Sequence, residues 1–218
     1  MMDRNVRIAK ELVRIAKTLV TQKKTNKIQE NAQIAILNEL DSQHFFKDKE
    51  GRAIFERWLT GKGDWFKAPF GDYLMKNDSL KTLIDSYILY TLIPEFLKSG
   101  ENEASVNKSI PIELDDNGYD TGYGLLHGTN ASVGNFQLHG KLTKFSDNEI
   151  NGDFKFWWCD KIDPNPKYLM DIIKSVGLHI MTLGSPEDYV ITIKFESKFK
   201  AIKRKSIWVL TGGFPAND

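Results

Sequence analysis

Apolar residues recur at helical spacing near the start of the chain. The stretch RIAKELVRIAKTLV, residues 7–20, is one heptad written twice with a single change. On a helix that turns 100° per residue, the apolar residues form two adjacent rows that cover nearly half of the circumference. The cationic residues lie on the opposite side. The predicted apolar face includes Ile8, Leu12, Val13, Ile15, Leu19 and Val20. The pattern therefore predicts an amphipathic helix with a broad apolar face.

Three interpretations of this helix are open. It can pack on its own domain, dock on another subunit or a larger assembly, or lie on an anionic membrane. Residues 1–30 hold eight cations against three carboxylates, an asymmetry typical of interaction tails. The polar segment 21–27 follows as a hinge. We therefore expect residues 1–27 to be a basic docking helix with its hinge, contacting a protein partner or larger assembly through residues 6–20.

Helical spacing continues through residues 28–100. Residues 52–59 predict a short helix with its aromatic and aliphatic side chains inward, and residues 80–93 give the strongest helical signal in the chain. Asp78 or Ser79 can cap this helix, and Pro94 is expected to disrupt or kink it. The polar stretch 99–109 predicts a connection to the next domain.

Period-two alternation dominates residues 110–218. In VGNFQLHGKLTKF, residues 133–145, apolar and polar residues take opposite sides, and DFKFWWC, residues 153–159, continues the buried side after a turn. Two more alternating stretches begin at residues 188 and 205, and residues 167–181 predict a helix crossing the sheet. The fold class is therefore α+β: a helical N-terminal half, then a twisted antiparallel sheet with a covering helix.

Composition narrows the functional classes. The chain of 218 residues has a net charge of +1, so no overall charge favours nucleic acid, and we expect no specific nucleic-acid partner. It holds a single cysteine and no apolar run of transmembrane length. We expect synthesis in a cytoplasm without a signal peptide, and no transmembrane segment.

Two carboxylates carry the strongest candidate chemistry. Asp160 and Asp163 lie three residues apart just after a predicted strand, in WWCDKIDPNPKY, residues 157–168. Paired carboxylates can bind a divalent ion or share acid and base roles. Aspartate in a turn also caps backbone amides without any catalysis. The basic stretch 198–205 is equally open: it can meet phosphate, or form a charged edge that discourages strand pairing.

These segments resemble a known family. GYGLLHG (122–128), GNFQLHGKL (134–142) and GDFKFWWCDKIDPNP (152–166) are similar to the C-terminal domains of colicin M-like bacteriocins and to Rhs-type polymorphic toxin tips. The resemblance implies cleavage of a phosphodiester-type linkage in a lipid-linked cell-wall precursor from the periplasmic side, with Asp160 and Asp163 as the acidic residues. Ile162 stands where the family has a tyrosine, and the family's downstream His-Arg pair has no counterpart.

Two functions follow from these observations. Because only two acidic positions of the motif are matched, we expect a non-catalytic structural protein of a phage virion or injection-type particle, docked through its N-terminal helix and needing no cofactor. The alternative is a colicin M-like effector enzyme with Asp160 and Asp163 as catalytic residues, for which a divalent metal is an option. The first of these functions also implies that the protein is incorporated into the particle.

Overall fold

The chain forms two compact units, each built from three separate segments. The structure is a computed structural model that describes residues 33–34, 37–38, 40–42, 44–61, 65–112, 114, 120–126, 135–163 and 187–212. Unit 1 comprises Met1–Trp65, Asp115–Leu126 and Lys161–Val190, and unit 2 comprises Phe66–Leu114, His127–Asp160 and Ile191–Asp218. The docking helix expected at residues 6–20, with its interaction residues, lies outside the described residues. The domain boundaries expected at 27 and 100–110 stay a prediction.

Unit 1 is organised around helix α3 (Lys49–Leu59), which confirms the helix expected at 52–59. Its apolar residues fall on one side, and all four that the spacing predicts to be inward are buried: Ile54, Phe55, Trp58 and Leu59. The Asp48 carboxylate caps the helix by accepting from the Gly51 amide at 2.6 Å, and it also accepts from the Gly122 amide at 2.9 Å. Gly122 begins the short helix α7 (Gly122–Leu125), so one side chain fixes two helix starts.

Unit 2 contains one long helical segment interrupted by a wider turn. Helix α4 (Gly71–Met75) precedes α5 (Asp78–Tyr87), the π-helical turn η1 (Ile88–Leu92) and α6 (Ile93–Ser99). The cap of α5 is Asn77, which accepts from the Leu80 amide at 2.8 Å, so the expectation of Asp78 or Ser79 was wrong by one or two positions. The helical segment continues through Pro94, which lies at the start of α6 directly after the π-helical turn η1, so the regular α-helix is interrupted just before the proline.

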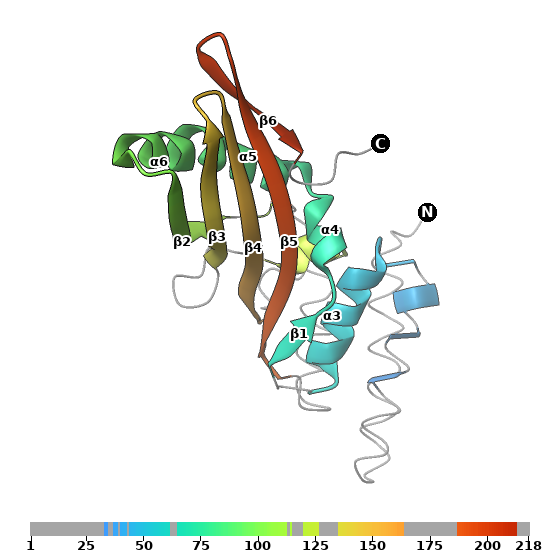
Figure 1. The fold of residues 1–218 in the computed structure, drawn as a ribbon. Helices are drawn as coiled ribbons and strands as arrows, with labels where there is room; N and C mark the ends of the chain where they lie inside the picture. Colours follow the sequence, from blue (N-terminus) through green and yellow to red (C-terminus); the bar gives the residue numbers. More distant parts are fainter. Residues whose placement is uncertain are drawn as a thin grey trace, which may run out of the picture. The chain divides into compact units, whose positions relative to one another are not determined.

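The six strands found among the described residues form one mixed sheet. They are β1 (Phe66–Ala68), β2 (Glu103–Pro111), β3 (Asn135–Ser146), β4 (Glu149–Ile162), β5 (Tyr189–Arg204) and β6 (Ile207–Gly212). The order is β1-β5-β4-β3-β2, and β6 pairs with the far end of β5 on the same edge as β1 (Figure 1). The assigned pairings β2–β3, β3–β4 and β5–β6 are antiparallel. The β1–β5 pair is parallel, which corrects the expectation of a purely antiparallel sheet.

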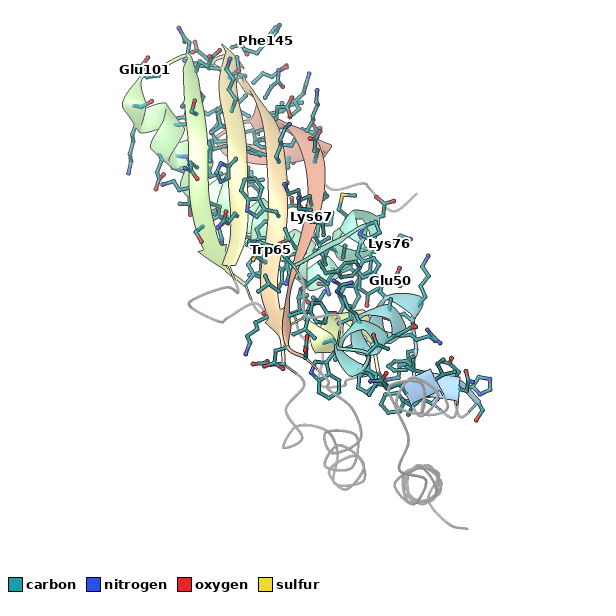
Figure 2. The ribbon with its side chains drawn as sticks, turned by 90° about the horizontal axis from the view of Figure 1, so that it is seen from below. Glu50, Trp65, Lys67, Lys76, Glu101 and Phe145 are labelled. Atoms are coloured by element: carbon teal, nitrogen blue, oxygen red, sulfur yellow. The ribbon has the colours of Figure 1, made fainter. Side chains whose placement is uncertain are left out.

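The hairpin β3–β4 confirms the alternation seen in the sequence. One face of the sheet, here called the inner face, carries large buried side chains, including Phe136, Leu138, Phe154, Phe156, Trp158, Ile193 and Phe195. The segment from α5 to α6 lies behind the sheet in Figure 1 and contributes buried residues of its own, such as Leu80, Ile84 and Ile93. The opposite, outer face carries polar and charged residues, whose side chains are drawn along the strands in Figure 2.

Two strands were not expected from the sequence. The polar composition of residues 99–109 predicts a connection, yet Glu103–Pro111 is strand β2, an edge strand whose exposed residues are polar. An edge strand needs few apolar residues because only one of its sides is paired and little of it is buried. Strand β1 is three residues long, and its pairing with β5 is what identifies it as a strand. The covering helix expected at residues 167–181 lies outside the described residues, and α+β is confirmed as the fold class.

Candidate active site

Asp160 lies on the inner face near the end of β4. Successive side chains of a strand point to opposite faces, so Asp160 follows Phe154, Phe156 and Trp158 on the same side. Only 2% of Asp160 is exposed. Moving a carboxylate from water into a protein interior costs on the order of several kcal/mol, unless hydrogen bonds or opposite charges replace the lost hydration. A carboxyl group in such a position is a candidate for proton transfer.

The residues before Asp160 in β4 are Cys159, whose side chain is on the opposite face of the strand, and Trp158, whose side chain is on the same face. The Thr192 hydroxyl donates to Cys159 Sγ at 3.9 Å. Burial raises the pKa of the Cys159 thiol, the Thr192 hydrogen bond partly offsets this, and the negative charge of Asp160 raises it further. Cys159 therefore stays a protonated thiol at neutral pH and is a poor nucleophile. The buried Trp158 Nε1 finds no acceptor among the described residues, which is unusual for a donor in a protein interior.

Asp163 has the opposite environment. It is exposed just after the end of β4, in unit 1, where Lys161 Nζ lies 3.5 Å from its carboxylate and 2.9 Å from that of Asp188. The hydrogen bond to Asp188 is the main cause that raises the pKa of Lys161. Exposed ion pairs of this kind contribute little to stability, typically about 0–1 kcal/mol. The structure therefore gives the two aspartates different surroundings, one buried and one solvated.

A tyrosine and an arginine of unit 1 also contact each other. The Tyr189 hydroxyl donates to the carbonyl of Ile54 at 2.8 Å, and the Arg57 guanidinium carbon lies 5.4 Å from the centre of the Tyr189 ring. Burial raises the pKa of Tyr189, with a smaller opposing effect of Arg57. Ile162, which stands at the family's tyrosine position, is buried and has no hydroxyl to offer. The phenol of Tyr189 is already committed to a backbone carbonyl.

Sequence reasoning found the two aspartates and missed the other polar groups described above. Lys161 lies between them in the chain and could have been noticed as an ion-pair partner. Asp188 and Tyr189 follow more than twenty residues later, and Arg57 lies over a hundred residues earlier in α3. No spacing rule connects such positions, because chain folding alone brings Lys161 to Asp188 and Arg57 to Tyr189. Whether Asp160 and Asp163 act in catalysis stays a prediction.

The outer face of unit 2 has a groove that does not provide a second site. The groove encloses about 510 Å³ over strands β3 to β6. Three lysines line it, but each is paired with a carboxylate: Lys141 with Glu103, Lys198 with Asp153, and Lys200 with Glu149. The positive charge of the groove is therefore neutralised locally. Within the described parts of the chain, no group of three histidine, cysteine, aspartate or glutamate side chains is arranged to hold a metal ion.

Comparisons with known proteins leave the family open. No family model matches the chain, and no curated protein matches it. Among solved structures, the chain is similar to PaeM, a colicin M-like bacteriocin produced by Pseudomonas aeruginosa, with 16% identity and a TM-score of 0.44. The match covers 77% of this chain and 52% of PaeM, so the chain spans about half of the length of that protein. A likeness at this level assigns neither a family nor an activity.

Proposed function

We propose that the chain is an effector domain of the colicin M-like type, hydrolysing a phosphodiester-type linkage in a lipid-linked cell-wall precursor. The observation that supports this most is the burial of Asp160 at the end of the aromatic strand β4. Of the family-like segments, residues 135–142 and 152–162 lie in the two strands of the β3–β4 hairpin, so this part of the sequence resemblance falls on one hairpin.

The chemistry proposed for Asp160 is proton transfer. A buried carboxyl group such as Asp160 is shielded from bulk water and can exchange a proton with a bound group, while a solvated carboxylate such as Asp163 is better suited to stabilise charge or bind a cation. The indole N–H of Trp158, on the same face of β4, is a donor available to an oxygen that gains charge. Ile162 provides no such group.

The virion reading has no support in these observations. Its docking residues lie outside the described part of the chain, and none of the findings reported above bears on a phage structural role. Docking through residues 6–20 therefore stays a prediction. Among the described residues, no helix is long and apolar enough to cross a bilayer.

Growth after export to the periplasm of a sensitive bacterium tests the proposed activity. The wild-type chain should lyse the cells, and Asp160→Asn, which keeps shape and removes the ionisable group, should abolish lysis. Asp163→Asn should reduce it. Asp153→Asn is the matched control, because Asp153 is exposed on the outer face and paired with Lys198; it should lyse like wild type.

Two further measurements make the outcome decisive. Thermal unfolding establishes that Asp160→Asn is folded, and release of the water-soluble headgroup from a purified lipid-linked precursor reports hydrolysis directly. Full activity of a folded Asp160→Asn variant would exclude the proposed role of this carboxyl group. A wild-type chain that neither lyses cells nor releases the headgroup would exclude the proposed function.

A further inference from the structure

In unit 2, the turn between β3 and β4 and the turn between β5 and β6 lie side by side at one end of the sheet (Figure 1). The Lys203 amide in β5 donates to the Asn148 carbonyl in the other turn at 2.9 Å. The charge of Lys203 also contributes to lowering the pKa of Asp147, after the larger effects of Lys144. These contacts join the two turns into one surface, called here the hairpin tip: residues 144–149 and 203–208.

The hairpin tip exposes two large apolar side chains. Phe145 is 74% exposed and Ile207 is 69% exposed. Phe145 lies where the β3–β4 register shifts, and Figure 2 shows it at the end of the strands, away from the labelled Lys67 and Lys76. Exposing a Phe or an Ile to water is unfavourable relative to burying it. The two turns therefore each expose one large apolar side chain.

Cations surround these apolar residues. The tip carries Lys144, Lys203, Arg204 and Lys205 against the carboxylates Asp147 and Glu149. Lys144 pairs with Asp147 at 2.7 Å and Lys200 pairs with Glu149 at 2.8 Å, so both carboxylates are neutralised nearby. Lys203, Arg204 and Lys205 are exposed, and no ion pair is found for them among the described residues. The tip is therefore both apolar and positively charged.

The backbone at Lys205 is in a conformation that favours glycine. Its φ is 58°, in the left-handed region, at the first of the two residues that join β5 to β6. In this conformation lysine destabilises the fold relative to glycine. The turn between β5 and β6 therefore holds a cation at a conformational cost. Behind it, Lys203 Nζ lies 6.0 Å from the centre of the Trp208 ring. Aromatic rings flanked by lysines are typical of the interfacial layer of membranes.

We propose that the hairpin tip binds the surface of a bilayer that contains anionic phospholipids. Phe145 and Ile207 insert among the upper acyl chains, and Lys203, Arg204 and Lys205 contact the phosphate-bearing headgroups. The positive charge of the tip favours an anionic bilayer over an apolar groove on another protein. The inference does not depend on hydrolysis, because a chain that binds vesicles without cleaving any precursor would still satisfy it.

Vesicle co-sedimentation of the full chain tests this inference. The wild-type chain should sediment with vesicles of phosphatidylcholine containing about one third phosphatidylglycerol, and much less with phosphatidylcholine alone, with binding that weakens as salt rises. Each lysine or arginine removed should weaken binding about fivefold, so Lys203→Gln with Arg204→Gln and Lys205→Gln should nearly abolish it. Phe145→Ser with Ile207→Ser should weaken it roughly tenfold or more.

Matched controls remove the same kind of group elsewhere in unit 2. Lys67→Gln with Lys76→Gln and Lys155→Gln removes three exposed cations away from the tip. Leu83→Ser with Tyr90→Ser removes two exposed apolar residues from the helical segment. Both controls should bind as wild type does. All comparisons are repeated with Leu12→Ser and Leu19→Ser, so that an N-terminal amphipathic segment cannot mask the effect.

Three outcomes would overturn the inference. The first is equal binding of the wild-type chain to neutral and anionic vesicles, or no binding to either. The second is tip variants that bind as well as the matched controls in the Leu12→Ser, Leu19→Ser background. The third is size-exclusion chromatography showing that Phe145 and Ile207 hold two copies of the chain together, because the tip would then be a protein interface.

Discussion

The two faces of the sheet in unit 2 come from the same strands and are held together in different ways. On the inner face, aromatic rings form a continuous network: the Phe156 ring stacks on Phe195 at 5.1 Å and lies 5.4 Å from Phe136. On the outer face, His139 stacks on Trp157 at 4.2 Å, and ion pairs such as Lys155–Glu196 join neighbouring strands. Buried packing contributes several kcal/mol per aromatic residue, while an exposed pair contributes under about 1 kcal/mol.

The difference separates stability from surface chemistry. Because the inner face supplies most of the free energy of folding, residues on the outer face and at the strand ends can change without unfolding the sheet. Asp160 is an exception, since it is a carboxylate on the inner face. Substitutions on either side of the same strand can test this division.

The largest effect is expected from Phe156→Ala. Phe156 is fully buried and contacts rings from two other strands, so its removal leaves a cavity. The free energy of unfolding should fall by about 3–5 kcal/mol in urea denaturation. Lys155→Ala, one position earlier and on the outer face, should change it by less than about 0.5 kcal/mol. Similar losses for the two variants would mean that the faces do not differ as described.

A second effect concerns two glycines whose missing side chains make room on the inner face. A Cβ at Gly140 would lie 2.1 Å from the backbone oxygen of Asp153, and a Cβ at Gly152 would lie 2.1 Å from the Phe199 ring. Either alanine should destabilise the protein by about 1–3 kcal/mol, more at Gly140 because backbone cannot swing aside. Phe199→Leu should relieve Gly152→Ala in a double-mutant cycle and leave Gly140→Ala unrelieved. Equal coupling at both sites would contradict this.

A smaller effect is expected on the outer face from Trp157→Ala. The variant loses the stack with His139 and the contact with Lys194, whose Nζ lies 5.7 Å from the ring centre. The expected loss is about 0.5–1.5 kcal/mol by urea denaturation. Lys194→Gln isolates the cation contact and should account for less than half of it. A loss as large as that of Phe156→Ala would show that Trp157 is part of the core.

The smallest effect is expected at the edge of the helical segment, from Asp85→Asn. Burial raises the pKa of Asp85, and the nearby Lys81 only partly offsets it. The folded chain therefore binds this proton more tightly than the unfolded chain, and Asp85 lowers stability as pH rises from its ordinary pKa of 3.8 through its raised folded value. Above that window the penalty is constant.

Urea denaturation at pH 3 and pH 7 measures this pH effect. Asp85→Asn should be slightly more stable than wild type at pH 7, and the difference should shrink at pH 3, where wild-type Asp85 is protonated. Lys81→Gln, which removes the charge that opposes the shift, should have the reverse effect at pH 7. A less stable Asp85→Asn at neutral pH would mean that the pair with Lys81 outweighs burial.

Local pattern by itself determined the elements with a strong period. The alternation in residues 133–159 predicted the β3–β4 hairpin with the correct residues inward, and the spacing in residues 52–59 predicted the buried side of α3. These predictions hold because burial of one face imposes a period on the sequence wherever an element is half covered. The pair Asp160 and Asp163 was also visible, since both follow the end of a predicted strand.

Only the tertiary structure decided which of these residues share an environment. The parallel pairing of β1 with β5, the burial of Asp160 against the exposure of Asp163, and the meeting of Lys161 with Asp188 all depend on contacts between distant parts of the chain. The same holds for the hairpin tip, where Phe145 and Ile207 lie sixty residues apart in sequence. Periodicity records whether a side chain is covered, but it carries no information on which distant segment covers it.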